Sequence, residues 1–170
     1  TLSAGEACHV MGANGVGKSS LIRVLAGLLP ASSGSFSLKR RVALADERLA
    51  LDPDIAVRDA LAHWARLDGA SDEIVDAALV ATGLDGLAFV PVRIFSTGQR
   101  KRAVLARVIA SGAEIWLLDE PANGLDSASL DRLGAAMADH RARGGVIIAA
   151  SHQPLPLADP MMLDLAGFAP

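Results

Sequence analysis

The chain has 170 residues, 51% of them apolar and 21% charged, which is typical of one soluble domain with a sizeable core. A net charge of −3 argues against nucleic acid as a partner, because domains that bind it usually carry a basic surplus. No apolar run approaches the roughly 18 residues of a membrane span, so a membrane-spanning part would have to belong to another chain. The one cysteine, Cys8, lies in an apolar stretch and is expected to be buried.

Apolar strand-like segments alternate along the chain with segments of helical spacing. In chain order the sequence predicts a strand at 7–12, a helix at 18–29, strands at 34–39 and 41–45, helices at 57–67, 71–82 and 100–110, a strand at 114–119, a helix at 127–143 and a strand at 146–151. Strands this apolar, alternating with helices, predict an α/β fold with a mostly parallel sheet flanked by helices.

A single domain over 1–170 is the predicted organisation. The stretch from about 48 to 95 holds only helices and loops, so we expect a short helical insert in a core formed by about 1–47 and 96–170. No signal peptide is visible. The chain begins with Thr1 rather than Met, so an N-terminal strand could be missing from it.

The segment "GANGVGKS" fits the phosphate-loop pattern G-x-x-x-x-G-K-S/T and lies between a predicted strand and a predicted helix. Its glycines let successive backbone N–H groups face inward, and the helix N-terminus adds partial positive charge. Lys18 should reach the β- and γ-phosphates of a nucleotide, and Ser19 should ligate Mg²⁺. The predicted nucleotide site comprises Gly12, Ala13, Asn14, Gly15, Val16, Gly17, Lys18, Ser19 and Ser20. The competing interpretation is an ordinary glycine turn before a helix.

Two carboxylates follow the apolar strand in "IWLLDEP". The carboxyl end of such a strand points into the crevice where an open parallel sheet binds its ligand. Asp119 can hold Mg²⁺, and Glu120 could take a proton from an attacking water. The alternative is a strand that ends in a polar turn marked by proline. Trp116 is expected to belong to the core rather than to a ligand site.

A second anion-binding element is indicated by "FSTGQRKR", residues 95–102. Small and polar residues stand where a helix could begin, and a helix start with free N–H groups binds anions. Three cations follow, for which the sequence alone leaves surface exposure and salt bridging open. By itself the segment could also be a solvated helix start with a basic face.

The order of the motifs resembles that of an ABC-type ATPase over nearly the whole chain. The phosphate loop is followed by "FSTGQ", "LLDEP", "NGLD" (123–126) and "ASHQ" (150–153), and "FSTGQ" is similar to the family's LSGGQ signature. The resemblance implies a P-loop NTPase fold, ATP and Mg²⁺ as ligands, and two chains that dimerise head to tail. The signature of one chain would then cover the ATP that its partner's phosphate loop holds, which explains why one chain carries two anion elements.

The resemblance also assigns roles to individual residues. Catalysis would rest on Glu120, on Lys18 and on His152, which matches the family's switch histidine near the γ-phosphate. Asp126 matches the residue of the D-loop that lines the dimer seam. The signature residues that would serve the partner's ATP are Ser96, Thr97, Gly98 and Gln99. His9, His63 and His140 have no such context and are expected to be structural or solvent-facing.

The chain departs from the family pattern in two places. Glu47 stands where the family's Q-loop has glutamine; it could still contact Mg²⁺ and is therefore a further candidate metal ligand. No aromatic residue lies upstream of the phosphate loop, within Thr1 to Met11, where the family stacks a ring on adenine. Either an N-terminal strand is missing or recognition of the base is weak.

The segments "SHQPLPL", "STGQRKR" and "LLDEPANGLD" are similar in sequence to those of the ATP-binding subunits of haem exporters in bacterial cytochrome c maturation. This resemblance implies an ATPase on the cytoplasmic face of the inner membrane, attached through permease subunits. Its hydrolysis would drive release of a haem-loaded chaperone. Three alternatives remain open: the ATPase subunit of another small ABC exporter, a non-catalytic nucleotide-sensing assembly module, and a soluble ABC protein of translation or DNA repair.

Overall fold

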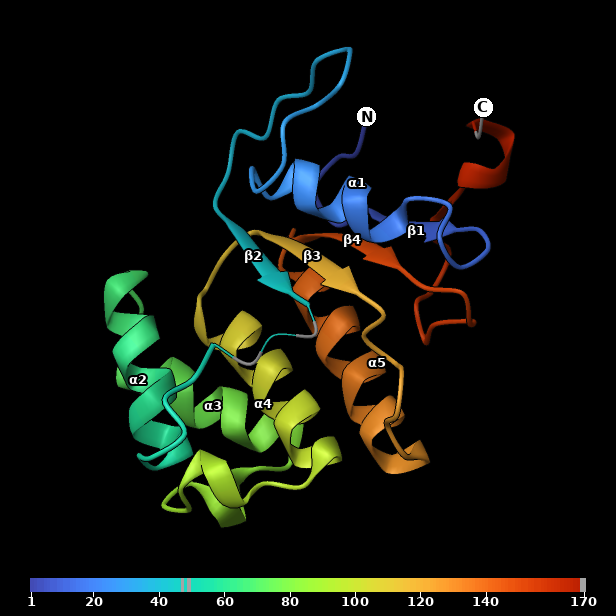
Figure 1. Ribbon diagram of the computed structural model, residues 1–170. Coiled ribbons are helices and arrows are strands. Elements are labelled where there is room, and N and C mark those ends of the chain that lie inside the picture. The colour runs from blue at the N-terminus through green and yellow to red at the C-terminus, as the bar shows by residue number, and fades with distance from the viewer. Residues whose placement is uncertain (47, 49, 169–170) are drawn as a thin grey trace.

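A five-stranded, all-parallel sheet organises the computed structural model, which describes residues 1–46, 48 and 50–168. The strand order is β2-β3-β4-β1-β5 (Figure 1). The strands are β1 (Ala7–Met11), β2 (Val42–Ala45), β3 (Ile115–Asp119), β4 (Val146–Ala150) and β5 (Met161–Asp164). Because every neighbouring pair is parallel, all the carboxyl ends lie at one edge of the sheet.

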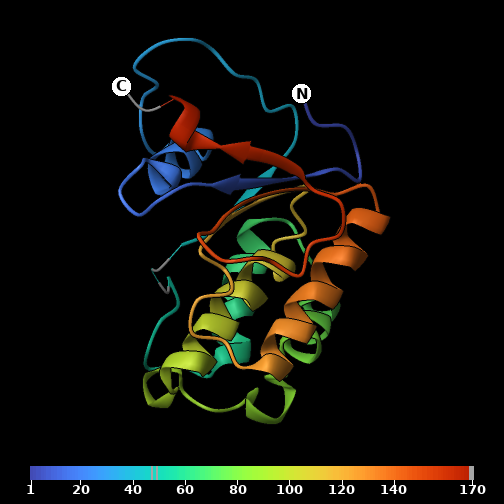
Figure 2. The ribbon, with the colours of Figure 1, turned by 90° about the vertical axis from the view of Figure 1, so that its right-hand side faces the viewer.

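Helices cover both faces of this sheet, as the view along its edge shows (Figure 2). The helix α1 (Lys18–Leu25) packs on one face, and α4 (Thr97–Ala110) and α5 (Ser127–Ala142) pack on the other. Side chains of β3 alternate between the two layers: Leu117 is buried in the cluster with Ile22 of α1, whereas Trp116 is buried in the cluster with Met137 of α5. The α/β fold with a parallel sheet flanked by helices is therefore confirmed.

The helices between β2 and β3 form a cluster of their own with α4. They are α2 (Val57–Leu67) and α3 (Asp72–Thr82), followed by the 3₁₀ turns Asp85–Leu87 and Val92–Ile94. Leu61, Val75 and Leu84 are fully buried there, against Ala103 and Ala106 of α4. The small alanine side chains of α4 let α3 approach closely, and the two helices pack along much of their length. The helix carrying the predicted signature thus belongs to this cluster on one side and to the sheet on the other.

The structure differs from the predicted elements in several places. The helix predicted at 18–29 ends at Leu25, because Gly27 takes a left-handed conformation with φ 74°. The strand predicted at 34–39 is wrong: this segment is largely exposed coil, and no strand of the described chain lies beside it to accept its backbone hydrogen bonds. The edge strand β5 was not predicted, since four residues of "MMLD" carry too little pattern to separate a strand from a loop.

Within the described residues, no helix is both long enough and apolar enough to cross a bilayer. Cys8 and Trp116 are buried, as predicted. Glu47, the candidate metal ligand at the Q-loop position, lies outside the residues that the structure describes.

Candidate functional site

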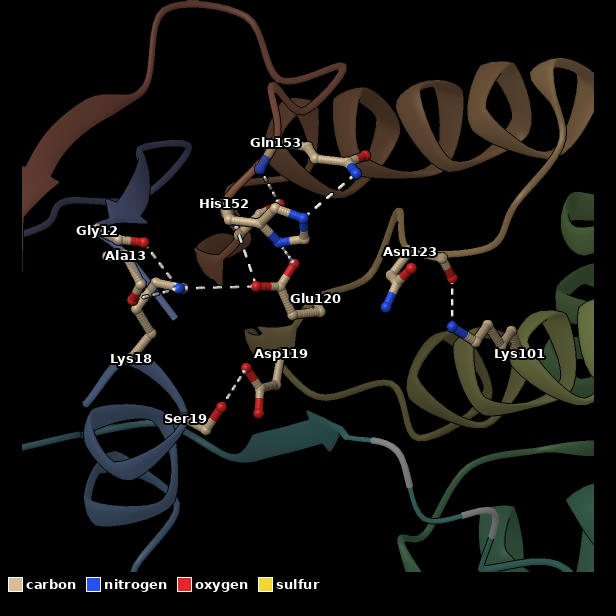
Figure 3. A network of polar contacts seen from close by, with 11 residues as sticks. Gly12, Ala13, Lys18, Ser19, Lys101, Asp119, Glu120, Asn123, His152 and Gln153 are labelled. Atoms are coloured by element: carbon tan, nitrogen blue, oxygen red, sulfur yellow. Dashed lines mark hydrogen bonds and ion pairs between the residues drawn. The ribbon is translucent and has the colours of Figure 1, made fainter. Parts of the chain in front are cut away.

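The candidate site lies where three strands end at the carboxyl edge of the sheet (Figure 3). The register pairs Asp119 of β3 with Ala150 of β4, and the N–H of Ser151 donates to the carbonyl of Val10 in β1. The segments following β1, β3 and β4 are therefore neighbours, although they are far apart in the sequence. This arrangement follows from the parallel pairing and from the strand order, in which β4 lies between β3 and β1, and it brings together the phosphate loop, the acidic pair and the predicted switch histidine.

Positive φ angles shape the phosphate loop between β1 and α1. Gly12, Gly15 and Gly17 have φ of 139°, 85° and 108°, values that residues with side chains rarely adopt. A Cβ at Gly12 would lie 2.8 Å from Cγ1 of Val16, so the loop also needs glycine there for space. Gly17 occupies the N-cap of α1, and no side chain caps the first turn of that helix. The N–H groups at the start of α1 are therefore open to a ligand.

Lys18 is the buried cation of the site, with 6% of its surface exposed. Its Nζ donates to the carbonyls of Gly12 at 2.9 Å and Ala13 at 3.2 Å, and lies 3.8 Å from Oε1 of Glu120. The loop thus curls around the ammonium group. The carbonyls of Gly12 and Ala13 hold the ammonium group inside the loop, where it can bind an anion together with the N–H groups of the loop.

Asp119 ends β3 with a half-buried carboxylate that accepts a hydrogen bond from Oγ of Ser19 at 3.0 Å. Burial raises the pKa of Asp119 above its ordinary value, and the hydrogen bond from Ser19 opposes this only in part. An ionised carboxylate at this depth gains most from a nearby cation. The hydroxyl and the carboxylate are the hard oxygen ligands that Mg²⁺ prefers, so these two residues fit a magnesium ion bound with a nucleotide.

Glu120 adopts a left-handed backbone conformation with φ 48°, which is unusual for a residue with a side chain. Its N–H donates to the carbonyl of Ala150 at 2.8 Å, so pairing with β4 supports this conformation. Its Oε2 lies 2.9 Å from Nδ1 of His152, and the backbone N–H of His152 donates to Oε1 at 3.3 Å. The amide nitrogen of Gln153 lies 3.3 Å from Nε2 of the same histidine. The structure therefore places all three predicted catalytic residues, Lys18, Glu120 and His152, in one contiguous group (Figure 3).

A hollow of about 350 Å³ lies over this group. It is lined by Asn14, Gly15, Gly17, Lys18, Ser19, Ser20, Glu120, Asn123 and His152. Of the predicted nucleotide-binding residues, Gly12, Ala13 and Val16 do not line it. Asn123 and Gln153 are candidate site residues that the sequence patterns did not single out. The signal that could have found them is their place in the motifs "NGLD" and "ASHQ".

The predicted signature residues lie apart from this hollow, at the start of α4. Ser96 and Gln99 close a capping box: the N–H of Gln99 donates to Oγ of Ser96 at 3.3 Å, and the N–H of Ser96 donates to Oε1 of Gln99 at 2.8 Å. The helix consequently begins at Thr97 rather than at the predicted Arg100. Gly98 has open space around it, since a Cβ added there would meet no atom within 4 Å. None of these four residues lines the phosphate-loop hollow of its own chain.

The cations after the signature bind backbone carbonyls rather than a free anion. Arg100 donates to the carbonyls of Phe95 and Arg93, Lys101 donates to that of Asn123, and Arg102 donates to those of Thr82 and Gly83. The three side chains therefore join α4 to three different segments. Arg102 in particular satisfies carbonyls at the C-terminal end of α3, where a helix otherwise leaves acceptors free.

Asp126, the predicted residue of the dimer seam, caps α5 at the surface. Its Oδ1 accepts a hydrogen bond from the N–H of Ser129 at 2.8 Å, and contact with Ser129 lowers the pKa of Asp126. The carboxylate thus has a structural role within its own chain, and the loop that carries it stands at the surface beside the site.

Known proteins share both the sequence and the fold. Residues 1–123 match the ABC transporter family. The cytochrome c biogenesis ATP-binding export protein CcmA of Zymomonas mobilis is 54% identical over 167 residues, covering 98% of this chain and 75% of its own. The protein of the same name from Novosphingobium aromaticivorans is 52% identical over 169 residues, covering 99% and 86%.

Among solved structures, an ABC transporter ATP-binding protein of Pyrococcus furiosus superimposes with a TM-score of 0.85 over 99% of this chain and 88% of its own. Its 22% identity makes this a likeness of fold. The motif order, the geometry of the phosphate loop and the close relatives agree with one another. The chain belongs to the ABC transporter family, in the group of the cytochrome c biogenesis ATP-binding export proteins.

Proposed function

We propose that this chain is the ATP-hydrolysing subunit of a haem-export or cytochrome c maturation complex. ATP hydrolysis is the general activity of its family, and its close relatives are named cytochrome c biogenesis ATP-binding export proteins. The observation that carries the catalytic part is the contact of Glu120 with both Lys18 and His152, directly beside the Ser19–Asp119 pair. Membrane permease subunits are the expected partners, as for ABC ATPases in general, and the cytoplasmic face of a bacterial inner membrane is the proposed location.

Phosphate binding begins at the open N-terminus of α1. The N–H groups of the loop and the ammonium of Lys18 bind the phosphate oxygens, and Lys18 exchanges its contact with Glu120 for the γ-phosphate. Mg²⁺, which Ser19 and Asp119 would hold, supplies positive charge to the phosphate oxygens. These residues position the nucleotide and neutralise its charge, and this accounts for most of the rate in phosphoryl transfer.

Glu120 acts as the general base for the attacking water. As the new bond forms between the water oxygen and the γ-phosphorus, the bond to ADP breaks, and a proton of the water passes to the carboxylate of Glu120. His152 orients that carboxylate through the contact of Nδ1 with Oε2. With Nδ1 donating, Nε2 of a neutral imidazole is an acceptor, which suits the amide of Gln153 beside it. The pair therefore holds the base in one orientation.

A second chain would complete each site. The signature residues do not line the hollow over their own phosphate loop, yet they form a helix start with exposed small residues. Head-to-tail pairing, as in the family, would place Ser96 and Gly98 against the partner's γ-phosphate. A homodimer in which each signature closes the other chain's site accounts for both anion elements.

The first experiment measures Mg²⁺-dependent ATP turnover against protein concentration, with Glu120→Gln beside the parent. We expect turnover to rise faster than linearly at low concentration, because two chains build each site. Glu120→Gln should bind ATP as the parent does but turn over about 100-fold or more slowly, and it should accumulate as an ATP-bound dimer. Hydrolysis by Glu120→Gln at the parent rate would show that another group is the base.

The cargo needs a separate test, because the candidate site accounts for the nucleotide and not for the molecule that the complex moves. Co-purification of the tagged chain from membranes should recover permease subunits that handle haem. Recovery of an unrelated permease would replace the proposed role with that of another small exporter. Mg·ATP binding without turnover, in the presence of the membrane subunits, would instead support a nucleotide-sensing module.

A further inference from the structure

Lys101 connects the signature helix to the loop that follows the candidate base, a contact that the mechanism above does not use. Its Nζ donates to the carbonyl of Asn123, from the first turns of α4 to the segment between β3 and α5 (Figure 3). Its stem lies along Gly124, where a Cβ would stand 3.3 Å from Nζ and 3.7 Å from Cε. Gly124 also has φ 72°, so glycine lets the lysine lie flat against the backbone.

The loop that Lys101 holds begins at the catalytic carboxylate itself. The N–H of Asn123 donates to the carbonyl of Glu120 at 3.1 Å and closes a tight turn over residues 120–123. Pro121 and Ala122 are buried and fix the base of this turn, whereas Asn123 and Gly124 are exposed. Packing therefore fixes one side of the turn, and polar contacts must fix its tip.

Open space lies on both sides of the turn. The phosphate-loop hollow of about 350 Å³ is on one side, lined in part by Glu120 and Asn123. A second hollow of about 460 Å³ lies between the turn and α4, lined by the same two residues together with Thr97 and Lys101. Lys101 reaches across this second hollow. Within the described part of the chain, no other side chain donates a hydrogen bond to the carbonyl of Asn123, so the lysine sets the distance between α4 and the tip.

We propose that Lys101 is a positioning residue that couples the two ATP sites of a dimer within each chain. The inference rests on the proposed function, in which α4 begins at the partner's ATP while the turn carries the base of the chain's own site. When α4 closes on the partner's γ-phosphate, the link from Lys101 through Asn123 moves the turn that holds Glu120. Binding at one site thereby sets the position of the base at the other.

Two variants of the full-length chain separate the charge of Lys101 from its bulk. Lys101→Met keeps an unbranched stem of similar length and removes the donor, whereas Lys101→Arg keeps a donor. Lys39→Met is the matched control, because Lys39 lies in the exposed coil away from the site. Each protein is assayed for ATP affinity, for kcat and KM with the Hill coefficient for ATP, and for backbone hydrogen exchange of residues 121–126 without nucleotide.

Lys101→Met should leave ATP affinity and KM within about twofold of the parent and lower kcat about 10- to 100-fold, since small misplacement of a reacting group has costs of this size. Its Hill coefficient should fall toward 1, and exchange of residues 121–126 should rise. Lys101→Arg should recover at least half of the lost kcat, and Lys39→Met should match the parent.

A parent-like kcat, Hill coefficient and exchange pattern in Lys101→Met would overturn the inference. A fall in both ATP affinity and unfolding temperature in Lys101→Met would also overturn it, because it would show that the lysine only supports the fold. Failure of the proposed function looks different: the parent itself would show no turnover or no cooperativity at any concentration, and that result would remove the coupling role too. The exchange measurement, made on the nucleotide-free chain, tests the tether apart from dimerisation.

Discussion

Gly145 is the position where one added methyl group should do the most damage outside the nucleotide site. A Cβ on Gly145 would lie 2.2 Å from Nε2 of His140, 2.3 Å from Cε1 and 2.4 Å from Cδ2. The imidazole cannot retreat, because its other face stacks on Trp116, with the ring centroids 3.9 Å apart and the planes 13° from parallel. Gly145→Ala must therefore push the histidine out of the stack.

The expected cost follows from the two contacts that change. Loss of the stacked pair lowers the free energy of unfolding by about 0.5–1.5 kcal/mol, and an extra methyl group in a packed site lowers it by about 1–3 kcal/mol. Together these lower the free energy of unfolding by about 2–4 kcal/mol, which corresponds to about 5–15 °C in the unfolding temperature for a chain of this length.

Thermal unfolding followed by circular dichroism measures this effect. Gly86→Ala is the control, because nothing lies within 4 Å of a Cβ at Gly86 and its φ is ordinary. In the double variant His140→Ala/Gly145→Ala the clash is gone, so adding Gly145→Ala to His140→Ala should cost little, with a coupling energy of about 1–3 kcal/mol. An unfolding temperature of Gly145→Ala within about 2 °C of the parent, or simple additivity in the double variant, would refute the reasoning.

Two further predictions concern charged groups. Burial lowers the pKa of His140 below its ordinary 6.5, so as the pH falls the unfolded chain takes up the proton before the folded chain does. The stability that comes from keeping this imidazole neutral is present above pH 6.5 and is lost as the pH falls from 6.5 through the lower folded pKa. Unfolding temperatures between about pH 7.5 and 5.5 should therefore drop more steeply for the parent than for His140→Phe, and parallel curves would contradict this. Burial raises the pKa of Asp119, so its contribution to stability is present below 3.8 and is lost as the pH rises through the folded pKa. At neutral pH, Asp119→Asn should raise the unfolding temperature of the nucleotide-free protein while lowering Mg²⁺-dependent turnover roughly 100-fold or more; a lower unfolding temperature would show that the Ser19 contact outweighs burial.

The elements that sequence patterns predicted well are those with a long or strongly apolar signal. The bounds of α2 agree residue for residue with the prediction, and β3 and β4 agree to within one residue at either end. The segment at 34–39 shows the limit of such patterns, because a strand forms only where another strand accepts its hydrogen bonds, and local composition does not show that neighbour.

The site was predictable to the extent that it depends on strand ends. In a parallel sheet with β4 between β3 and β1, the residues after these strands meet. The motifs at two of these positions name Lys18 and Glu120, and the family resemblance adds His152. Ser96 and Gln99 also carried a readable signal, since Ser-x-x-Gln before a helix is a capping box. The contact between Lys101 and Asn123 could not be read, because it joins two segments whose distance depends on how α4 packs.

The starts of α1 and α4, the two helix starts proposed to bind anions, differ in how their N–H groups are occupied. At α1 no side chain caps the first turn. At α4 the side chains of Ser96 and Gln99 already accept hydrogen bonds from each other's backbone N–H groups. A phosphate that arrives at α1 meets vacant donors; one that approaches α4 competes with an internal ligand worth about 1 kcal/mol. This difference ranks the two events in time. Each chain should therefore bind ATP first at its own phosphate loop. The cap of α4 is displaced only by a nucleotide that the loop of a second chain already holds, because its local concentration is then high. Association of the two chains should therefore follow ATP binding.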